Sequence, residues 1–116
     1  MFRFETLEVW KKSVDVLDRL LDIADKLTQR NLFRFAEQLR GAGISISNNI
    51  AEATGCDTRG EILLFLTYAK RSAYEVVSML IVFNRRKYIT DTTKKQLIDA
   101  AEELCKMITG FGRSLR

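Results

Sequence analysis

The stretch QLRGAGISISNNIAE, residues 38–52, sets the pattern for the whole 116-residue chain. Its apolar residues recur at spacings of three and four, which predicts one buried stripe on a helix. That stripe comprises Leu39, Ala42, Ile46, Ile50 and, just beyond the stretch, Ala53. Gly, Ser and Asn, which fill much of the remainder, form helices less readily than Ala does. Contacts with other helices or subunits must therefore hold this helix in place.

A polar stripe runs beside the apolar one, because Gln38, Ser45 and Glu52 recur every seven residues. The candidate structural and assembly motif consists of Gln38, Arg40, Ser45, Asn48, Asn49 and Glu52. These side chains could bind a ligand, or they could pair between helices, since buried polar groups are hydrogen-bonded. We favour the pairing network, which also fixes register in some self-assembling bundles. Gly41 and Gly43 would let a neighbouring helix approach closely.

Apolar periodicity along the rest of the chain predicts three further helices. The four run from Thr6 as N-cap to near Leu27, from about Phe33 to Thr54, from about Arg59 to Arg86, and from a cap at Thr90 or Asp91 onward. The chain contains no Pro, and the turns between the helices are short. We therefore predict one all-α domain over residues 1–116, folded as an antiparallel up-down-up-down four-helix bundle.

Several details follow from local sequence. Gly55 is expected to take the left-handed conformation that ends many helices. Asp57 or Thr58 is expected to cap the third helix, and Glu61 completes a T-x-x-E capping box with Thr58. The predicted buried face of the first helix is Leu7, Trp10, Val14, Leu17, Leu21 and Ala24. The third helix is apolar on more than one side, which indicates packing on two neighbours or on another subunit.

Composition argues against several classes of protein. The chain has no His, which removes the commonest general base and the ligand that di-metal bundle sites require. We therefore predict no metal, no cofactor and no enzymatic activity. Cys56 and Cys105 lack metal-site spacing, and we expect free thiols. No apolar run approaches the roughly 18 residues of a membrane span, and the N-terminus does not resemble a secretory signal. We expect a cytoplasmic protein.

Charge is distributed unevenly along the chain. Residues 1–57 carry 8 Lys and Arg against 9 Asp and Glu, whereas residues 58–116 carry 11 against 6. The candidate nucleic-acid contacts in this basic half are Lys70, Arg71, Arg85, Arg86, Lys87, Lys94 and Lys95, and Arg113 with Arg116 adds a further pair. Such clusters indicate either a phosphate-binding surface or solvated charge at helix ends. Trp10 and the Phe residues sit at helical spacing and are expected in the core.

The stretch at residues 38–53, QLRGAGISISNNIAEA, resembles the signature of a bacterial four-helix-bundle family, of the form Q-L-R-R-A-A-x-S-I-P-S-N-I-A-E-G. That family includes proteins encoded within intervening sequences of 23S ribosomal RNA genes. The accessory variability determinant of diversity-generating retroelements is similar. Matching residues are Gln38, Leu39, Arg40, Ala42, Ser45, Ile46, Asn49, Ile50, Ala51 and Glu52, and the likeness extends to LEVW at 7–10 and FLTYAKRSAYE at 65–75. Ser47 replaces the usual Pro, and Ala53 and Arg71 each replace a usual Gly.

The resemblance implies a bundle that assembles into a ring, in known cases a homopentamer. For the retroelement relative it implies binding of RNA and of a reverse transcriptase through basic surface, and it brings no catalytic residues. We therefore expect a non-enzymatic oligomeric module that binds RNA or DNA, or a ribonucleoprotein accessory that also contacts a reverse transcriptase or another protein. The alternative is a ring-shaped protein scaffold without a nucleic-acid role. An enzyme would need Gln38, Asn49 and Glu52 to converge in a pocket.

Overall fold

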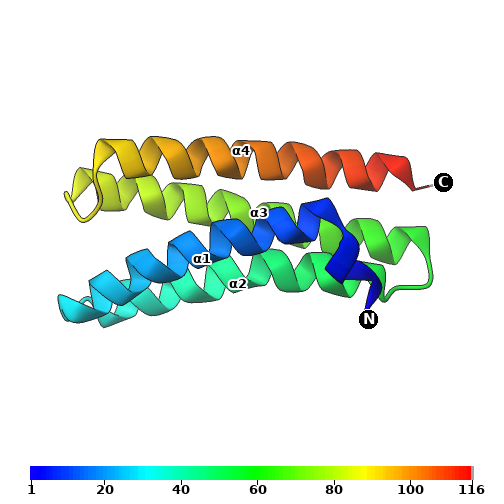
Figure 1. Cartoon of the computed structure of the whole chain (residues 1–116), viewed down its shortest axis with the longest axis horizontal. Helices are drawn as coiled ribbons and strands as arrows, with labels where there is room; N and C mark the ends of the chain where they lie inside the picture. Colours follow the sequence, from blue (N-terminus) through cyan, green and yellow to red (C-terminus); the bar gives the residue numbers. More distant parts are fainter. Residues whose placement is uncertain (116) are drawn as a thin grey trace.

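The computed structural model describes residues 1–115 and consists of helices (Figure 1). A short 3-10 segment, η1 (Arg3–Thr6), precedes α1 (Glu8–Gln29), α2 (Phe33–Thr54), α3 (Arg59–Arg85) and α4 (Asp91–Ser114). Consecutive helices are antiparallel and pack side by side, and α4 also packs on α1. The bundle measures 46 × 22 × 22 Å. The prediction of an all-α up-down-up-down four-helix bundle is confirmed.

The apolar stripe of α2 lies in the centre of the core, as predicted. Leu39, Ile50 and Ala53 are fully buried, and Ala42 and Ile46 are nearly so. They meet a row of small and branched residues on α3 that is equally buried. That row is Leu66, Ala69, Ala73, Val76, Leu80 and Phe83. The small side chains on both helices allow the two backbones to lie close together along their length.

The predicted buried face of α1 is partly wrong. Leu17 and Ala24 are buried, but Leu7, Trp10, Val14 and Leu21 are only half-buried. The centre of the face is instead formed by Val9, Ser13, Val16, Leu20, Ile23 and Leu27. The reason is that α1 packs against both α2 and α4. Its apolar face is therefore wide, and the sequence pattern picks out one margin of it.

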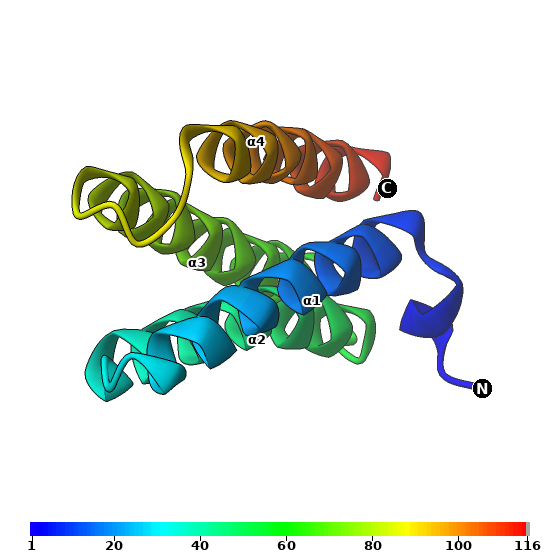
Figure 2. The ribbon, with the colours of Figure 1, turned by 60° about the vertical axis from the view of Figure 1, so that its left-hand side comes forward.

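The N-terminus differs from the prediction that Thr6 caps the first helix. The Thr6 hydroxyl donates to the Arg3 carbonyl at 3.0 Å and so closes η1, and the helix begins two residues later with Leu7 as N-cap. The aromatic rings of Phe4 and Trp10 lie 5.0 Å apart, while Phe2 remains 73% exposed. Figure 2 shows η1 standing beyond the first turn of α1. Phe4 therefore fastens this segment to the bundle.

At the turn between α2 and α3, the predicted cap is found at the start of α3 but not at the end of α2. The backbone N–H of Glu61 donates to the Thr58 hydroxyl at 3.2 Å, as expected for this capping box. Gly55, however, has φ −92° and stays in the right-handed region, so the predicted left-handed cap is wrong. The helix ends here without it, because the N–H groups of Gly55 and Cys56 donate to Glu52 and Ala53.

The two glycines of α2 have different surroundings. A Cβ added to Gly43 would lie 3.1 Å from side-chain carbons of both Leu17 and Leu20 on α1, whereas one added to Gly41 would meet nothing within 4 Å. The predicted close approach therefore holds for Gly43 alone.

Two predictions from composition also concern the fold. Cys56 and Cys105 are both free thiols, as expected. Among the described residues, no helix combines the length and the apolarity that a membrane crossing requires.

Candidate nucleic-acid interface

The turns α1–α2 and α3–α4 lie at the same end of the bundle (Figure 1). The helices that precede these turns, α1 and α3, each end in a Schellman-type C-cap, in which two backbone N–H groups donate to carbonyls of the last helical turn. After α1, Leu32 donates to Leu27 at 2.9 Å and Asn31 donates to Thr28 at 3.0 Å. Asn31 sits at φ 62°, a left-handed conformation that Asn tolerates better than most residues.

The end of α3 has the same cap, with Lys87 in the left-handed position that Asn31 occupies after α1. The N–H of Tyr88 donates to Phe83 at 2.8 Å, and that of Lys87 donates to Asn84 at 2.9 Å. Lys87 has φ 61°, which is unusual for a residue other than Gly or Asn. The motif turns the chain sharply and leaves Arg85, Arg86 and Lys87 exposed around the bend.

Tyr88 joins the two turns. Its ring lies 6.1 Å from that of Phe83 and 6.3 Å from that of Phe35 at the start of α2. The guanidinium carbon of Arg30 lies 4.9 Å from the centre of the same ring, within cation–π range. This aromatic contact holds the turn from the acidic half of the chain against the turn from the basic half.

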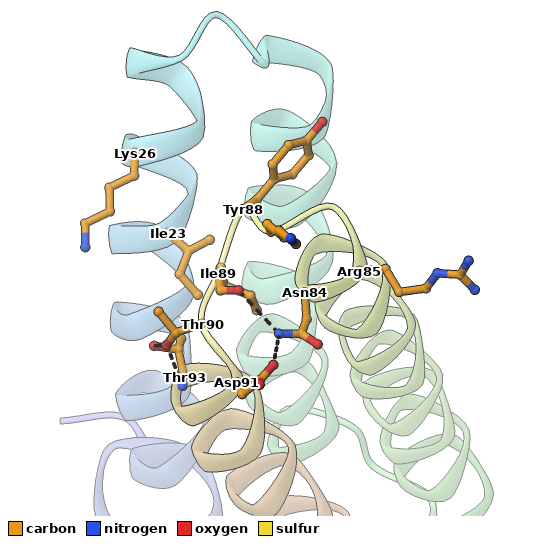
Figure 3. Close-up of a pocket in the computed structure, with 10 residues that line it drawn as sticks. Ile23, Lys26, Asn84, Arg85, Tyr88, Ile89, Thr90, Asp91 and Thr93 are labelled. Carbon is orange, nitrogen blue, oxygen red and sulfur yellow. Dashed lines mark hydrogen bonds between the residues drawn. The ribbon is translucent and has the colours of Figure 1, made fainter.

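A cavity of about 520 Å³ opens between α1 and the α3–α4 turn (Figure 3). On one side the Asn84 amide donates to the Ile89 carbonyl at 3.3 Å and to an Asp91 carboxylate oxygen at 2.8 Å. The Thr90 hydroxyl accepts from the Thr93 N–H at 3.1 Å, as the predicted N-cap of α4. These hydrogen bonds fix the conformation of the loop backbone, so the cations around the loop are attached to a rigid backbone.

Six cations surround the two turns, and we name them the basic end: Lys26, Arg30, Arg34, Arg85, Arg86 and Lys87. The last three are nucleic-acid contacts predicted from the sequence. The first three, which belong to the acidic half of the chain, were not predicted. The signal that could have found them is topological. In an up-down-up-down bundle the first and third turns share one end.

Lys94 and Lys95 begin α4 near this end but differ from the other cations. Lys94 is half-buried, and the Lys95 ammonium pairs with the Asp99 carboxylate at 3.1 Å. Lys70 and Arg71 lie fifteen and fourteen residues before Arg85 on α3, which is about 21–22 Å along the helix axis. The seven predicted contacts therefore fall on at least two surfaces, and Arg116 lies outside the described residues.

The polar stripe of α2 divides into paired and exposed side chains. The Ser72 hydroxyl of α3 donates to that of Ser45 at 2.8 Å. The Asn49 amide donates to the carbonyl and the hydroxyl of Ser45 at 2.8 and 3.0 Å. The bond from Ser72 links α2 to α3, whereas those from Asn49 stay within α2. The remaining members, Gln38, Asn48 and Glu52, are exposed.

Arg40 links α2 to α1 instead. Its guanidinium donates to Asp25 and Thr28 of α1, both at 3.0 Å, and to Glu37 at 2.7 Å. The hydrogen bond to Asp25 is the main reason that the pKa of Arg40 is raised.

Features of an enzyme site do not assemble among the described residues. No group of three His, Cys, Asp or Glu side chains converges as a metal site would require. Gln38, Asn49 and Glu52 do not line the cavity at the basic end or the cavities between α3 and α4.

Comparison with known proteins identifies the family. The family model described as "23S rRNA-intervening sequence protein" matches residues 5–110. The chain belongs to this family. It is also similar to a crystal structure from Bacteroides thetaiotaomicron, described as a protein of unknown function from the S23 ribosomal protein family. The TM-score is 0.84 at 25% identity, over 89% of this chain and 96% of that one. No curated protein matches.

Proposed function

We propose that this member of the 23S rRNA-intervening sequence protein family is a non-enzymatic, cytoplasmic, oligomeric nucleic-acid-binding module. The basic end supplies its sequence-independent contacts to phosphates, and the resemblance to RNA-binding ribonucleoprotein accessories supports the same function. Neither the family description nor the structural neighbour names an activity.

The observation that carries the proposal is the convergence of six cations at two turns held together by Tyr88. Among the described residues, none of these six lies within ion-pair distance of a carboxylate, whereas nearby Arg40 contacts two. Cations that are not already paired within the protein remain available to phosphates. Neutralising phosphates in this way releases counterions and supplies most non-specific affinity.

Exposed apolar side chains support assembly into an oligomer. On α3 these include Leu64, Ile81 and Val82, exposed by 45–50%. They lie outside the faces that pack on α2 and α4 within the chain. Apolar residues that cluster at the surface of one chain commonly mark contacts with another.

The test is binding to structured RNA and to duplex DNA across a salt series, with the particle mass measured in parallel. Replacing Arg85, Arg86 and Lys87 by Glu should abolish binding while leaving the circular dichroism spectrum unchanged. The control replaces Arg3, Lys11 and Arg19 of the N-terminal segment and α1 by Glu, so it changes net charge equally at a distance from the basic end. Binding that survives in the first variant, or is lost equally in both, would show that the basic end is not the site.

A protein-interaction scaffold is the second candidate, and the exposed apolar residues of α3 favour it. In that case the wild-type chain would bind neither nucleic acid even at low salt. An oligomer that still exposes Leu64 or Ile81 after assembly would support this function.

A further inference from the structure

A groove follows the outer junction of α3 and α4, away from the basic end. It contains adjoining cavities, of which two measure about 390 and 340 Å³ and share Lys70, Thr109 and Arg113. The Lys70 ammonium donates to the Thr109 hydroxyl of α4 at 3.0 Å and so connects the two helices. Gly110 of α4 leaves the groove open on that side, because a Cβ there would meet nothing within 4 Å, whereas Gly112 packs closely on Leu63 of α3.

The groove is strongly cationic. Four cations line the cavities between α3 and α4, namely Arg59, Lys70, Lys106 and Arg113, and a fifth, Arg71, lines an adjoining hollow formed by α3 alone. Glu102 is the single carboxylate among the lining residues. In the described part of the chain, none of these five forms an ion pair. Glu61 and Glu75, the acidic residues of α3, do not line it. A track of positive charge therefore runs beside α4 with little to neutralise it.

Tyr74 stands in the middle of this track. It lines three of the cavities, between Lys70 and Arg71 on its own helix and Lys106 on α4. Its side chain is 70% exposed, and its ring takes part in none of the aromatic contacts found in the bundle. An aromatic ring left bare among cations is the combination that single-strand binders use.

We propose that the α3–α4 groove binds a single-stranded segment of nucleic acid, with Tyr74 stacking on a base and the surrounding cations contacting phosphates. This inference builds on the proposed nucleic-acid function and assigns the single strand to a site separate from the basic end. It also gives a role to Lys70 and Arg71, which the basic end does not include.

A single strand fits this surface better than a duplex for two physical reasons. The bases of a duplex are stacked on one another, so an exposed Tyr ring finds no free base face there, whereas an unpaired base offers one. Sequence-tolerant binding also needs cations along a track with an aromatic ring among them, rather than polar groups aimed at base edges. Thr67 and Thr109 are the neutral hydroxyl groups lining the groove near the cations.

The first experiment compares Tyr74→Leu with Tyr68→Leu for binding of a labelled single-stranded RNA oligonucleotide. Six residues along the helix place Tyr68 about 120° around the axis from Tyr74, and its ring packs edge-on against Phe65. Tyr74→Leu should weaken binding about tenfold, the size of effect that losing one stacked base produces. Tyr74→Phe should bind like the wild type, and so should Tyr68→Leu.

Salt dependence tests the cations. Replacing Lys106 and Arg113 by Ala should lower the slope of log K against log salt by about 1.4 for a single strand, since each phosphate contact contributes about 0.7. The triple Glu variant at Arg85, Arg86 and Lys87 should reduce duplex binding more than single-strand binding. The groove variant should show the opposite preference.

The chain supplies its own reporter of occupancy. Cys105 lines the groove beside Tyr74, while Cys56 lies in the α2–α3 turn and outside it. Adding the oligonucleotide should slow alkylation of Cys105 at least severalfold and leave Cys56 unchanged, as followed by peptide mass spectrometry. Cys105 that is protected before any oligonucleotide is added, with protection lost on dilution, would identify a second copy of this chain as the occupant and overturn the proposal.

The outcomes separate the two inferences. A wild-type chain that binds neither oligonucleotide nor duplex overturns both. Binding that is lost in the basic-end variant but unaffected by Tyr74→Leu and by the Lys106 and Arg113 changes overturns the groove alone. Tenfold loss in Tyr74→Leu with Cys105 protection in the wild type supports the groove, whatever the duplex result.

Discussion

The two hairpins of this bundle share a topology but differ in how their helices meet. In α1–α2, Gly43 brings the backbone of α2 against Leu17 and Leu20, and Arg40 adds an ionic link to Asp25 at 3.0 Å. In α3–α4, the helices leave a row of cavities lined by cations. The first hairpin uses its interface for packing, and the second leaves part of its interface open. The proposed groove therefore lies on the hairpin whose interface is partly open, whereas the basic end draws on the turns of both hairpins.

The largest effect that would test this contrast comes from filling the tight interface. Gly43→Leu should lower the free energy of unfolding by about 3 kcal/mol, because even its Cβ would lie 3.1 Å from two Leu side chains. Gly110→Leu on α4 is the control, since a Cβ there meets nothing within 4 Å. Urea denaturation measures both. Equal losses in the two variants would mean that the close contact of Gly43 with α1 is not the cause of the loss.

A smaller effect should distinguish the turns that close each hairpin. Lys87→Gly should raise the free energy of unfolding by about 1 kcal/mol, because Gly adopts the left-handed conformation without the steric cost that Lys carries. Asn31→Gly should change stability less, since Asn is already tolerated there. The midpoints of urea denaturation compare them. A larger gain at Asn31 would contradict the assignment of strain to Lys87.

The smallest effect is a pH dependence that comes from Cys105 on α4. Burial is the main reason that the pKa of the Cys105 thiol is raised. The unfolded thiol has a pKa of about 8.5. The raised pKa of the folded thiol therefore stabilises the protein fully below that pH, and this stabilisation is lost as the pH rises through the pKa of the folded thiol. The stability difference between wild type and Cys105→Ser should therefore shrink from pH 8 to pH 10. A pH-independent difference would contradict this linkage.

Sequence reasoning predicted the parts of the fold that depend on periodicity. The bounds of α2, its buried stripe and the Thr58 cap of α3 all follow from local spacing and side-chain chemistry, and the structure confirms them. The α1 face was misplaced, because a helix packed on two neighbours has a wide apolar surface whose centre periodicity does not define.

The candidate sites were less predictable, because they depend on which segments meet in space. Neither Asn31 nor Lys87 is a glycine, so composition did not mark the two left-handed caps that close the turns, and Gly55 gave a false signal. The cations of the acidic half come beside those of the basic half where Phe35, Phe83 and Tyr88 pack together. In the sequence, Tyr74 is one more aromatic residue at helical spacing. Its exposure could be predicted only if the position of α4 were already known.

Both described ends of the chain lie at the end of the bundle opposite to the basic end (Figure 1). A tag, fluorophore or surface tether attached at either terminus is therefore held off from the basic end along a molecule 46 Å long. The Debye length in physiological salt is about 8 Å, so the charge of such an attachment is screened several times over before it reaches the basic end. Immobilised or tagged protein should report the same salt dependence at that end as untagged protein.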